Sequence, residues 1–521
     1  MNRFKKLLYL LVLICSLFVV GCNNTGGGST NNGPLTEEEI NEQVNTKFAQ
    51  LDSETIKFTK QESMGNEDVT TVTLLSVNDF HGALEPTDYE YGAARLGGYL
   101  IDRYNQNPAG TVFLSAGDMF QGTGISNYRH GRDTLTWMNG LGFSAMTLGN
   151  HEFDWSLDKV LSYRDGDTSN GESTFPFLGC NIIDKRTNNL PVNVLPYTVI
   201  VKNNVRIGIV GYIGYGIEDD IATSMVKDYQ FLNPVTCVAE NVKKLRTVEN
   251  CDLVIAIGHD DSSTTNSSIA NLEGDERVDG IFNGHAHLQK SQYLNTNDGR
   301  RVPVVQGGSS GEALSELTFT LVDGKWECKT AYYHKMKNIE ENAEIKSYVD
   351  RLVDITSLIF KRVLTYAGQE FNKYSAIDWA VDALRKHSNV DVAFINDGGI
   401  RADAFPINKG QEVKVENVYR IMPFDNTIKT VKLTGEQIIS LTIVNGYSYS
   451  SSLYQEGSTW YINGQKLDRE VLYSVAAIDY IFDKDDSIFK KGVDIVATGI
   501  LFRDILIDDL ESIGLNGKWT N

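Results

Sequence analysis

Residues that commonly bind metal ions recur in five short clusters, most of them placed just after an apolar run. The clusters contain five of the eight histidines of the chain. Each also contains a glycine, which lets the backbone turn sharply and come close to a ligand. One such cluster alone would usually be an ordinary turn, but five in this order indicate a single site. They are Asn78-Asp79-Phe80-His81-Gly82, Gly117-Asp118, Gly149-Asn150-His151-Glu152-Phe153-Asp154, Gly258-His259 and Asn283-Gly284-His285-Ala286-His287.

The donor atoms in these clusters indicate the kind of ion and the kind of chemistry. Side-chain oxygens together with imidazole nitrogens suit Mn, Zn, Fe, Co or Ni better than calcium. Seven candidate ligands are too many for one tetrahedral zinc. They fit two ions about 4 Å apart that share a carboxylate, an arrangement used for phosphoryl displacement. The seven are Asp79, His81, Asp118, Asn150, His259, His285 and His287.

The segments before the clusters predict the scaffold that positions them. Short β-branched runs that end in polar residues predict buried strands, and amphipathic stretches such as 94–104 and 234–247 predict helices between them. This alternation is typical of a layered α/β domain, in which loops at the carboxyl ends of the strands converge on one crevice. We expect this domain to span residues 69–335. The runs are 72–78, 111–116, 205–212, 253–257, 280–282 and 302–306.

A second, smaller domain is predicted to follow. Residues 336–362 have a helical pattern of apolar positions and are expected to form a linker helix. The rest of the chain, 363–521, is predicted to be the second domain. Its expected elements are a helix over 375–387, a strand over 390–395 and later strands over 427–433 and 471–476.

The N-terminal residues predict export and membrane anchoring. A basic start precedes an apolar run over residues 7–20, which is typical of a signal-peptide core and short for a membrane span. The following Gly21-Cys22 resembles a bacterial lipobox, which makes 1–21 a signal peptide and Cys22 a lipid anchor. An ordinary signal peptide with a chance cysteine is the alternative. Residues 22–68 are expected to be a flexible tether that holds the protein at the outer face of the cell membrane.

Charge and cysteine usage exclude some functions. The formal net charge is −20. An acidic protein is a poor partner for long nucleic acid, which needs a basic face. It can still hold a small anionic substrate by local cations. Four cysteines follow Cys22 without close paired spacing, and we expect mostly buried thiols, with a Cys237–Cys251 disulfide as the alternative.

The five clusters together resemble the motif series of the calcineurin-like metallophosphoesterases. The forms Asn78-Asp79-Phe80-His81-Gly82 and Gly149-Asn150-His151-Glu152-Phe153-Asp154 are narrower, and resemble the bacterial 5′-nucleotidase / UDP-sugar hydrolase / 2′,3′-cyclic phosphodiesterase group. The resemblance includes Ala94-Arg95-Leu96-Gly97-Gly98 and Asn396-Asp397-Gly398-Gly399-Ile400-Arg401, so it spans nearly all of the chain beyond the tether. It implies a four-layer-type α/β-sandwich catalytic domain followed by a smaller α+β substrate-binding domain.

The resemblance also implies how the candidate ligands divide between two divalent ions. Asp79, His81 and His287 would bind the first ion. Asp118 would bridge both ions. The second ion would be completed by Asn150, His259 and His285.

Catalytic and substrate-binding roles follow from the same resemblance. His151 would stabilise charge that develops in the transition state or protonate the leaving oxygen, and Asp154 would hold its ring. In the second domain, Arg401 would contact phosphate. Asn396 would position the nucleoside. Two aromatic residues would stack on the base and an acidic residue would contact the ribose; these are Phe424, Tyr480 and Asp486.

The chain departs from the family pattern around the expected substrate pocket. Asp397 stands where the family has glycine, which would add negative charge near the phosphate. Lys484-Asp485-Asp486-Ser487 replaces a glycine-rich segment, and no arginine precedes the helix at Ser375. The first hypothesis is therefore a cell-surface hydrolase of nucleotide phosphate esters. The second is the same chemistry on a 2′,3′-cyclic nucleotide, a UDP-sugar or another phosphomonoester. A non-catalytic surface binding lipoprotein is the third.

Overall fold

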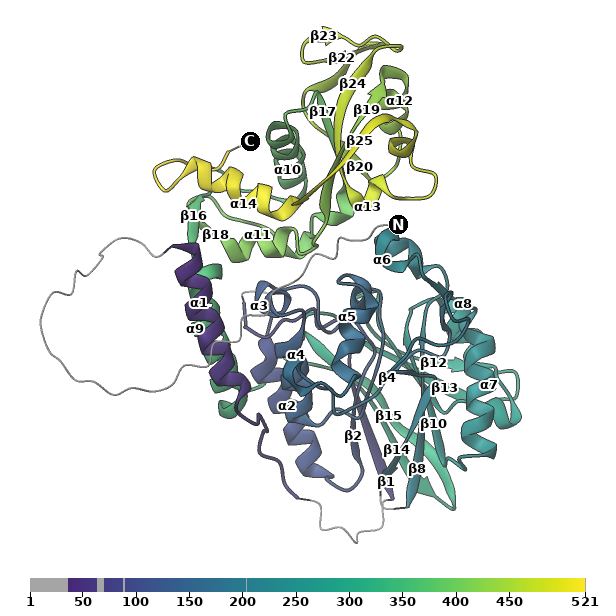
Figure 1. Ribbon diagram of the computed structural model, residues 1–521. Coiled ribbons are helices and arrows are strands. Elements are labelled where there is room, and N and C mark those ends of the chain that lie inside the picture. Colours follow the sequence, from purple (N-terminus) through teal and green to yellow (C-terminus); the bar gives the residue numbers. More distant parts are fainter. Residues whose placement is uncertain (1–35, 63–69, 88–89, 203, 521) are drawn as a thin grey trace, which may run out of the picture.

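The computed structural model describes residues 36–62, 70–87, 90–202 and 204–520. It contains a large domain built on two sheets and a smaller C-terminal domain built on one main sheet (Figure 1). Helix α9 (Ala343–Phe360) leads from the large domain to the small one.

The large domain contains a seven-stranded and a six-stranded sheet. The order in the first is β15-β14-β1-β2-β3-β4-β6, and in the second β12-β13-β11-β10-β8-β7. The first sheet comprises β1 Thr71–Val77, β2 Thr111–Ser115, β3 Ala145–Thr147, β4 Phe177–Leu178, β6 Val194–Leu195, β14 Ala313–Val322 and β15 Lys325–Lys335. The second comprises β7 Tyr197–Lys202, β8 Val205–Ile213, β10 Leu253–His259, β11 Gly280–Asn283, β12 Gln289–Asn295 and β13 Arg301–Gly307.

The two sheets pack face to face and carry helices on their outer faces. One buried apolar cluster contains residues from both sheets, among them Leu74 of β1, Leu114 of β2 and Ile255 of β10. A second cluster covers the other face of the six-stranded sheet with α7 and α8, and a third covers the seven-stranded sheet with α2, α4 and α9. The predicted four-layer α/β sandwich is therefore confirmed. The helices are α2 Gly92–Gln106, α3 Gly124–Tyr128, α4 Arg132–Leu141, α5 Leu157–Leu161, α6 Thr223–Val226, α7 Pro234–Thr247 and α8 Ser263–Ala270.

The direction of the strands explains why distant clusters meet. β1, β2, β3 and β4 run parallel in one sheet, and β8, β10, β11 and β13 run parallel in the other. The carboxyl ends of neighbouring parallel strands lie at the same edge of a sheet. The polar residues that follow β1, β2, β3, β10 and β11 are thereby brought to one end of the sandwich.

The C-terminal domain is built around a sheet of order β20-β17-β24-β19-β25. Its helix α10 packs against β17 and α14, and α11 contacts α3 and α9 of the large domain. The main elements are β16 Val363–Tyr366, α10 Lys373–Ser388, β17 Val392–Asn396, β18 Glu412–Lys414, α11 Val415–Ile421, β19 Thr427–Thr434, α12 Gly435–Leu441, β20 Tyr447–Tyr449, β24 Leu472–Ile478, α13 Asp479–Phe482, β25 Val493–Leu501 and α14 Phe502–Ile513.

A helix near the N-terminus corrects one expectation. α1 (Glu37–Asp52) lies beside α9 (Figure 1), and Lys47 Nζ lies 2.9 Å from Asp354 of that helix. The prediction that the flexible tether continues to residue 68 is wrong for this segment. Its apolar residues recur at helical spacing, so they form a face that can be buried against the large domain. The buried ones are Val44, Phe48 and Leu51.

Several expectations about the N-terminus concern residues outside the described part of the chain. They are the signal peptide over 1–21, the lipid anchor Cys22 and the start of the tether. No helix among the described residues is long and apolar enough to cross a membrane. In the same part of the chain all four cysteines are free thiols, with Cys180 and Cys251 buried, so the alternative Cys237–Cys251 disulfide is not formed.

Candidate metal and substrate site

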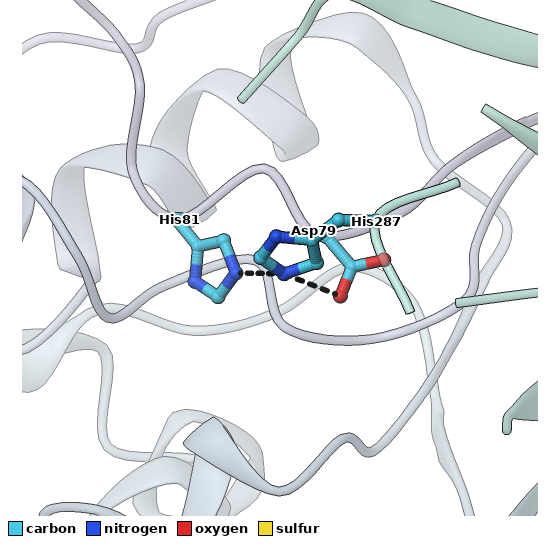
Figure 2. A group of neighbouring side chains, drawn as sticks. All are labelled: Asp79, His81 and His287. Carbon is cyan, nitrogen blue, oxygen red and sulfur yellow. Dashed lines mark hydrogen bonds and ion pairs between the residues drawn. The ribbon is translucent and has the colours of Figure 1, made fainter. Parts of the chain in front are cut away.

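Three residues from two distant loops form the first cluster of metal-binding side chains. His81 Nε2 lies 3.1 Å from His287 Nε2, which lies 3.5 Å from Asp79 Oδ1 (Figure 2). The Nδ1–H of His81 donates to the Gln121 carbonyl oxygen at 2.9 Å, which directs Nε2 toward the cluster. Metal-ligating histidines usually have such a carbonyl or carboxylate partner on the second ring nitrogen.

A second cluster lies next to the first. His259 Nε2 lies 3.0 Å from Asp118 Oδ2 and 3.0 Å from Asn150 Oδ1, and His285 Nδ1 lies 3.1 Å from the same Asn150 oxygen. His259 also donates Nδ1–H to the Ala116 carbonyl at 2.8 Å. An oxygen of Asp118 also lies within 4.8 Å of a ring nitrogen of His81, so its carboxylate lies between both clusters. All seven predicted ligands thus converge, and His285 and His287 serve different clusters.

The backbone is strained where these side chains are presented. Five of the seven candidate ligands have positive φ angles between 48° and 76°, although none is glycine. Such angles are uncommon for non-glycine residues and cost free energy that the surrounding structure must supply. They concentrate where side chains must turn toward one point. The five are Asp79, His81, Asp118, His285 and His287.

Two buried polar residues hold the loops in place, and sequence reasoning gave neither a role. The Glu152 carboxylate accepts backbone N–H groups of Asp118, Met119 and Gly149 at 2.7–3.0 Å, which ties two loops together. Asn78 donates to Asp79 Oδ2 and to the Gly308 carbonyl, both at 2.6 Å. Both residues stand inside the motifs. A charged or amide residue next to candidate ligands was therefore the sequence signal that could have identified them.

Gly122 permits the close approach of the loop that carries His81, and this predicts a local mutational effect. A Cβ atom there would lie 2.2 Å from the His81 carbonyl oxygen and 2.6 Å from its Cβ. We expect Gly122→Ala to lower the free energy of unfolding by about 2 kcal/mol through overpacking, and to weaken metal binding because His81 moves. Chemical denaturation and metal titration measure the two effects.

Gly410 provides the control for a generic glycine substitution. A Cβ there meets nothing within 4 Å, and only the positive φ of 85° opposes alanine. Gly410→Ala should cost about 1 kcal/mol and leave metal affinity unchanged. Equal metal affinities in the two variants would contradict the account of Gly122.

His151 lies at the edge of both clusters and is oriented by a carboxylate. Its Nδ1–H donates to Asp154 Oδ2 at 2.8 Å, and its Nε2 lies 4.0 Å from Asp118 Oδ2. Burial opposes the charged imidazole, but the carboxylates of Asp154 and Asp118 raise the pKa of His151 to about 9. The ring therefore presents Nε2 as a proton donor beside the metal-binding groups.

Burial and close charges shift the pKa values of several side chains in the clusters. Burial raises the pKa of Asp79 to about 6. Burial opposes protonation of His259, but Asp118 raises its pKa to about 10. Burial, with the neighbouring Arg401, lowers the pKa of His287 to about 4. Strongly shifted pKa values in a buried group are typical of a functional site. The donor types, carboxylates and imidazoles, suit a divalent ion.

A cavity of about 380 Å³ joins these residues to the C-terminal domain. Arg401 and Phe424 of the small domain line the cavity together with His151 of the large domain. The rings of His151 and Phe424 are stacked, with centroids 5.7 Å apart. The acidic part of the lining consists of five aspartates, Asp118, Asp154, Asp220, Asp425 and Asp479. The lining includes Asp118, Asn150, His151, Asp154, Asp220, His285, His287, Asn396, Gly398, Gly399, Arg401, Phe424, Asp425, Asn426, Asp479 and Tyr480.

The structure places the predicted substrate residues unequally. Asn396, Arg401, Phe424 and Tyr480 all line the cavity, and the Tyr480 hydroxyl donates to the Asp219 carbonyl of the large domain at 3.1 Å. Asp486 is exposed and is not among the lining residues.

Asp397 and Asp220 show what the sequence did not reveal. Asp397 does not line the cavity, because its carboxylate accepts the Ser448 hydroxyl at 2.6 Å. The expected negative charge near the phosphate is therefore turned away. Asp220, which no motif contained, does line the cavity, with Oδ2 3.5 Å from His285 Nε2.

Two family descriptions match this chain. Residues 72–289 match the calcineurin-like phosphoesterases, and residues 354–491 match the C-terminal domain of 5′-nucleotidases.

Individual relatives agree with these matches. The chain is 25% identical to cell wall protein Lmo0130 of Listeria monocytogenes, over 84% of this chain and 67% of the relative. It is 27% identical to the 5′-nucleotidase of Rattus norvegicus, over 70% of each protein. The 5′-nucleotidase precursor of Thermus thermophilus has the same fold, with a TM-score of 0.71 and 23% identity over 87% of this chain and 98% of that one.

The fold and the family matches define a phosphoester hydrolase of the calcineurin-like class, a class that uses divalent metal ions. The chain belongs to the 5′-nucleotidase-like metallophosphoesterase family, because this domain is followed by a 5′-nucleotidase C-terminal domain. The predictions of family, fold class and enzyme class are confirmed.

Proposed function

We propose that the protein hydrolyses nucleotide phosphate esters in the cavity between its two domains. One observation carries the proposal: the same cavity is lined by candidate metal ligands of the large domain and by Arg401 and Phe424 of the small one. A phosphate held at the metal end would place its leaving group toward the aromatic end. Residues 69–335 would form the catalytic domain, 336–362 the linker and 363–521 the substrate domain.

Two divalent ions would be held by the two clusters. Asp79, His81 and His287 would hold one, with Asp118 as the shared ligand. The other would be held by Asn150, His259 and His285. Bound ions of the Mn, Zn, Fe, Co or Ni type would activate water and offset negative charge on the phosphate.

His151 would act on the leaving group as water attacks phosphorus and the phosphorus–oxygen ester bond breaks. The Asp154 carboxylate fixes Nδ1–H, so only Nε2 of His151 is free to face the cavity. In that position the imidazole can donate its proton to the departing oxygen. Its cationic form also stabilises charge on the phosphate oxygens.

The C-terminal domain would bind the rest of the substrate. The Arg401 guanidinium is the one cationic group among the cavity-lining residues other than histidine, and its fork matches phosphate oxygens. Phe424 and Tyr480 would contact the base, and Asn396 the nucleoside. Asp486 would reach the ribose only if its exposed segment moves toward the cavity.

The acidic lining favours a second candidate substrate class. Asp154, Asp220, Asp425 and Asp479 line the cavity, where Asp154 pairs with His151 and Asp425 with Arg503. Arg401 is the one lining residue with a permanent positive charge. Repulsion between these carboxylates and further phosphates would favour a substrate with one phosphate group. A 2′,3′-cyclic nucleotide or a small phosphomonoester meets this condition as well as a nucleoside 5′-phosphate does, and a UDP-sugar meets it less well.

We further propose that the protein acts outside the cell. The basic start, the apolar run over 7–20 and Gly21-Cys22 support a signal peptide and a lipid anchor on Cys22. One related protein is named a cell wall protein and others are snake venom 5′-nucleotidases.

A substrate panel tests the proposed activity. Phosphate release would be measured with Mn²⁺ or Zn²⁺ from AMP, ADP, UDP-glucose, 2′,3′-cAMP and glycerol 2-phosphate. We expect AMP to be hydrolysed and ADP to be slower, because the lining is acidic. Phe424→Ala should raise the KM for AMP about tenfold by loss of stacking, with little effect on glycerol 2-phosphate.

Two results would change the proposal. Release from the cyclic or small esters alone would keep the metal site and replace the substrate. Absence of release from every ester, with metal bound, would favour a binding protein.

A further inference from the structure

One backbone carbonyl connects the two domains beside the cavity. The Pro423 carbonyl oxygen, in the loop 422–426 between α11 and β19, accepts hydrogen bonds from three side chains. The donors are Gln121 Nε2 at 2.9 Å, Asn127 Nδ2 at 3.0 Å and Arg503 Nη1 at 3.0 Å. Gln121, Asn127 and Arg503 are 2%, 8% and 4% exposed.

The donors come from both domains. Gln121 and Asn127 belong to the large domain. Arg503, in α14, belongs to the small domain, and so does Pro423. A carbonyl oxygen has two lone pairs, so three donors satisfy it fully. Buried donors left without a partner cost free energy, and Gln121 would lose its partner if the loop moved away. The loop is therefore held to the large domain at Pro423.

Gln121 also contacts the first metal-binding cluster through its main chain. Its carbonyl oxygen accepts the Nδ1–H of His81 at 2.9 Å. The residue after Pro423 is Phe424, whose ring stacks on His151. Gln121 thus orients the candidate metal ligand His81 through its backbone carbonyl. Through its side chain it holds the loop that carries Phe424.

We propose that Gln121 is a positioning residue that fixes the distance between the metal cluster and Phe424, and so selects esters whose leaving group spans the cavity. This inference rests on the proposed function, in which the phosphate binds at the metal cluster and a nucleoside base at Phe424. A small ester has no base to stack on Phe424, so its hydrolysis should depend less on the hydrogen bond to Pro423.

The test replaces the donor without changing the size of the side chain. In Gln121→Met the backbone carbonyl that holds His81 is retained, so metal content should equal that of the wild type. We expect kcat/KM for AMP to fall about tenfold, mainly through KM, and kcat/KM for glycerol 2-phosphate to change less than about twofold. Hydrogen exchange of amides in residues 422–428 should become faster.

A second variant and a control complete the experiment. Asn127→Asp removes the other large-domain donor but keeps the oxygen that accepts the Gly122 N–H at 2.8 Å, and it should act in the same direction. The exposed Gln106→Met is the control and should change nothing. Unchanged exchange in both variants, or equal losses on both substrates, would overturn the inference. A wild type inactive on AMP but active on glycerol 2-phosphate would refute the nucleotide proposal alone. Faster hydrogen exchange of residues 422–428 in Gln121→Met would then still support the positioning role of Gln121, and unchanged exchange would refute it.

Discussion

Replacing Asp118 by asparagine should abolish binding of a metal pair and reduce phosphate release at least about 1000-fold. The residue is 1% exposed, and its carboxylate lies within 4.8 Å of the ring nitrogens of His81 in the first cluster and of His259 and His285 in the second. Burial opposes its charge, yet His259 and His151 hold the pKa of Asp118 well below its ordinary value. Asparagine keeps the shape and removes the charge that would neutralise two cations.

Metal content by mass spectrometry and phosphate release measure the two effects together. The exposed Asp323→Asn provides a control of equal charge change, since Asp323 stands in the turn between β14 and β15, beside the amino end of β1 and so at the opposite end of that strand from Asp79. That variant should retain both ions and most of its activity. If Asp118→Asn retained two ions and normal turnover, Asp118 would not be the shared ligand.

His151→Ala should reduce kcat by about 100- to 10,000-fold, because general acid catalysis and charge stabilisation are both lost. The size of the loss should depend on the leaving group. A nucleoside oxygen needs a proton as it departs, whereas p-nitrophenolate is stable without one. We therefore expect a larger loss with AMP than with p-nitrophenyl phosphate, while metal content stays unchanged.

Asp154→Asn separates orientation of the ring from the chemistry of His151. The amide keeps one oxygen for the Nδ1–H bond that now spans 2.8 Å, but its charge is gone. We expect an intermediate loss of about 10- to 100-fold. Equal losses of His151→Ala on both leaving groups would exclude the role of proton donor and leave only charge stabilisation.

Much of the fold and of the site could be predicted because the relevant signals are local. A strand that is buried on both faces needs a continuous apolar run, and a loop that presents ligands needs glycine and polar residues at the strand end. Asp79 and Asp118 stand within three residues of the end of such a strand, and His259 is the last residue of one. Parallel pairing then brings the strand ends together, and the seven donors converge as the sequence indicated.

Other features depend on contacts between residues far apart in the chain. The apolar face of α1 is buried only because it packs against α9 and against Tyr128 of α3, both distant in sequence. Without these partners its segment looked like part of a tether. Asp397 follows a strand as a ligand would, but Ser448 of β20 binds its carboxylate. Neither partner lies near these residues in the sequence.

By itself the sequence determined the class of the protein and its set of candidate ligands, because motif spacing and strand periodicity are written along the chain. The tertiary structure alone decided which acidic side chains face the cavity, since Asp220 lines it and Asp397 does not. It also decided that Pro423 meets Gln121 across the domain boundary. The physical reason is that hydrogen bonds and burial depend on distances that folding sets between segments hundreds of residues apart.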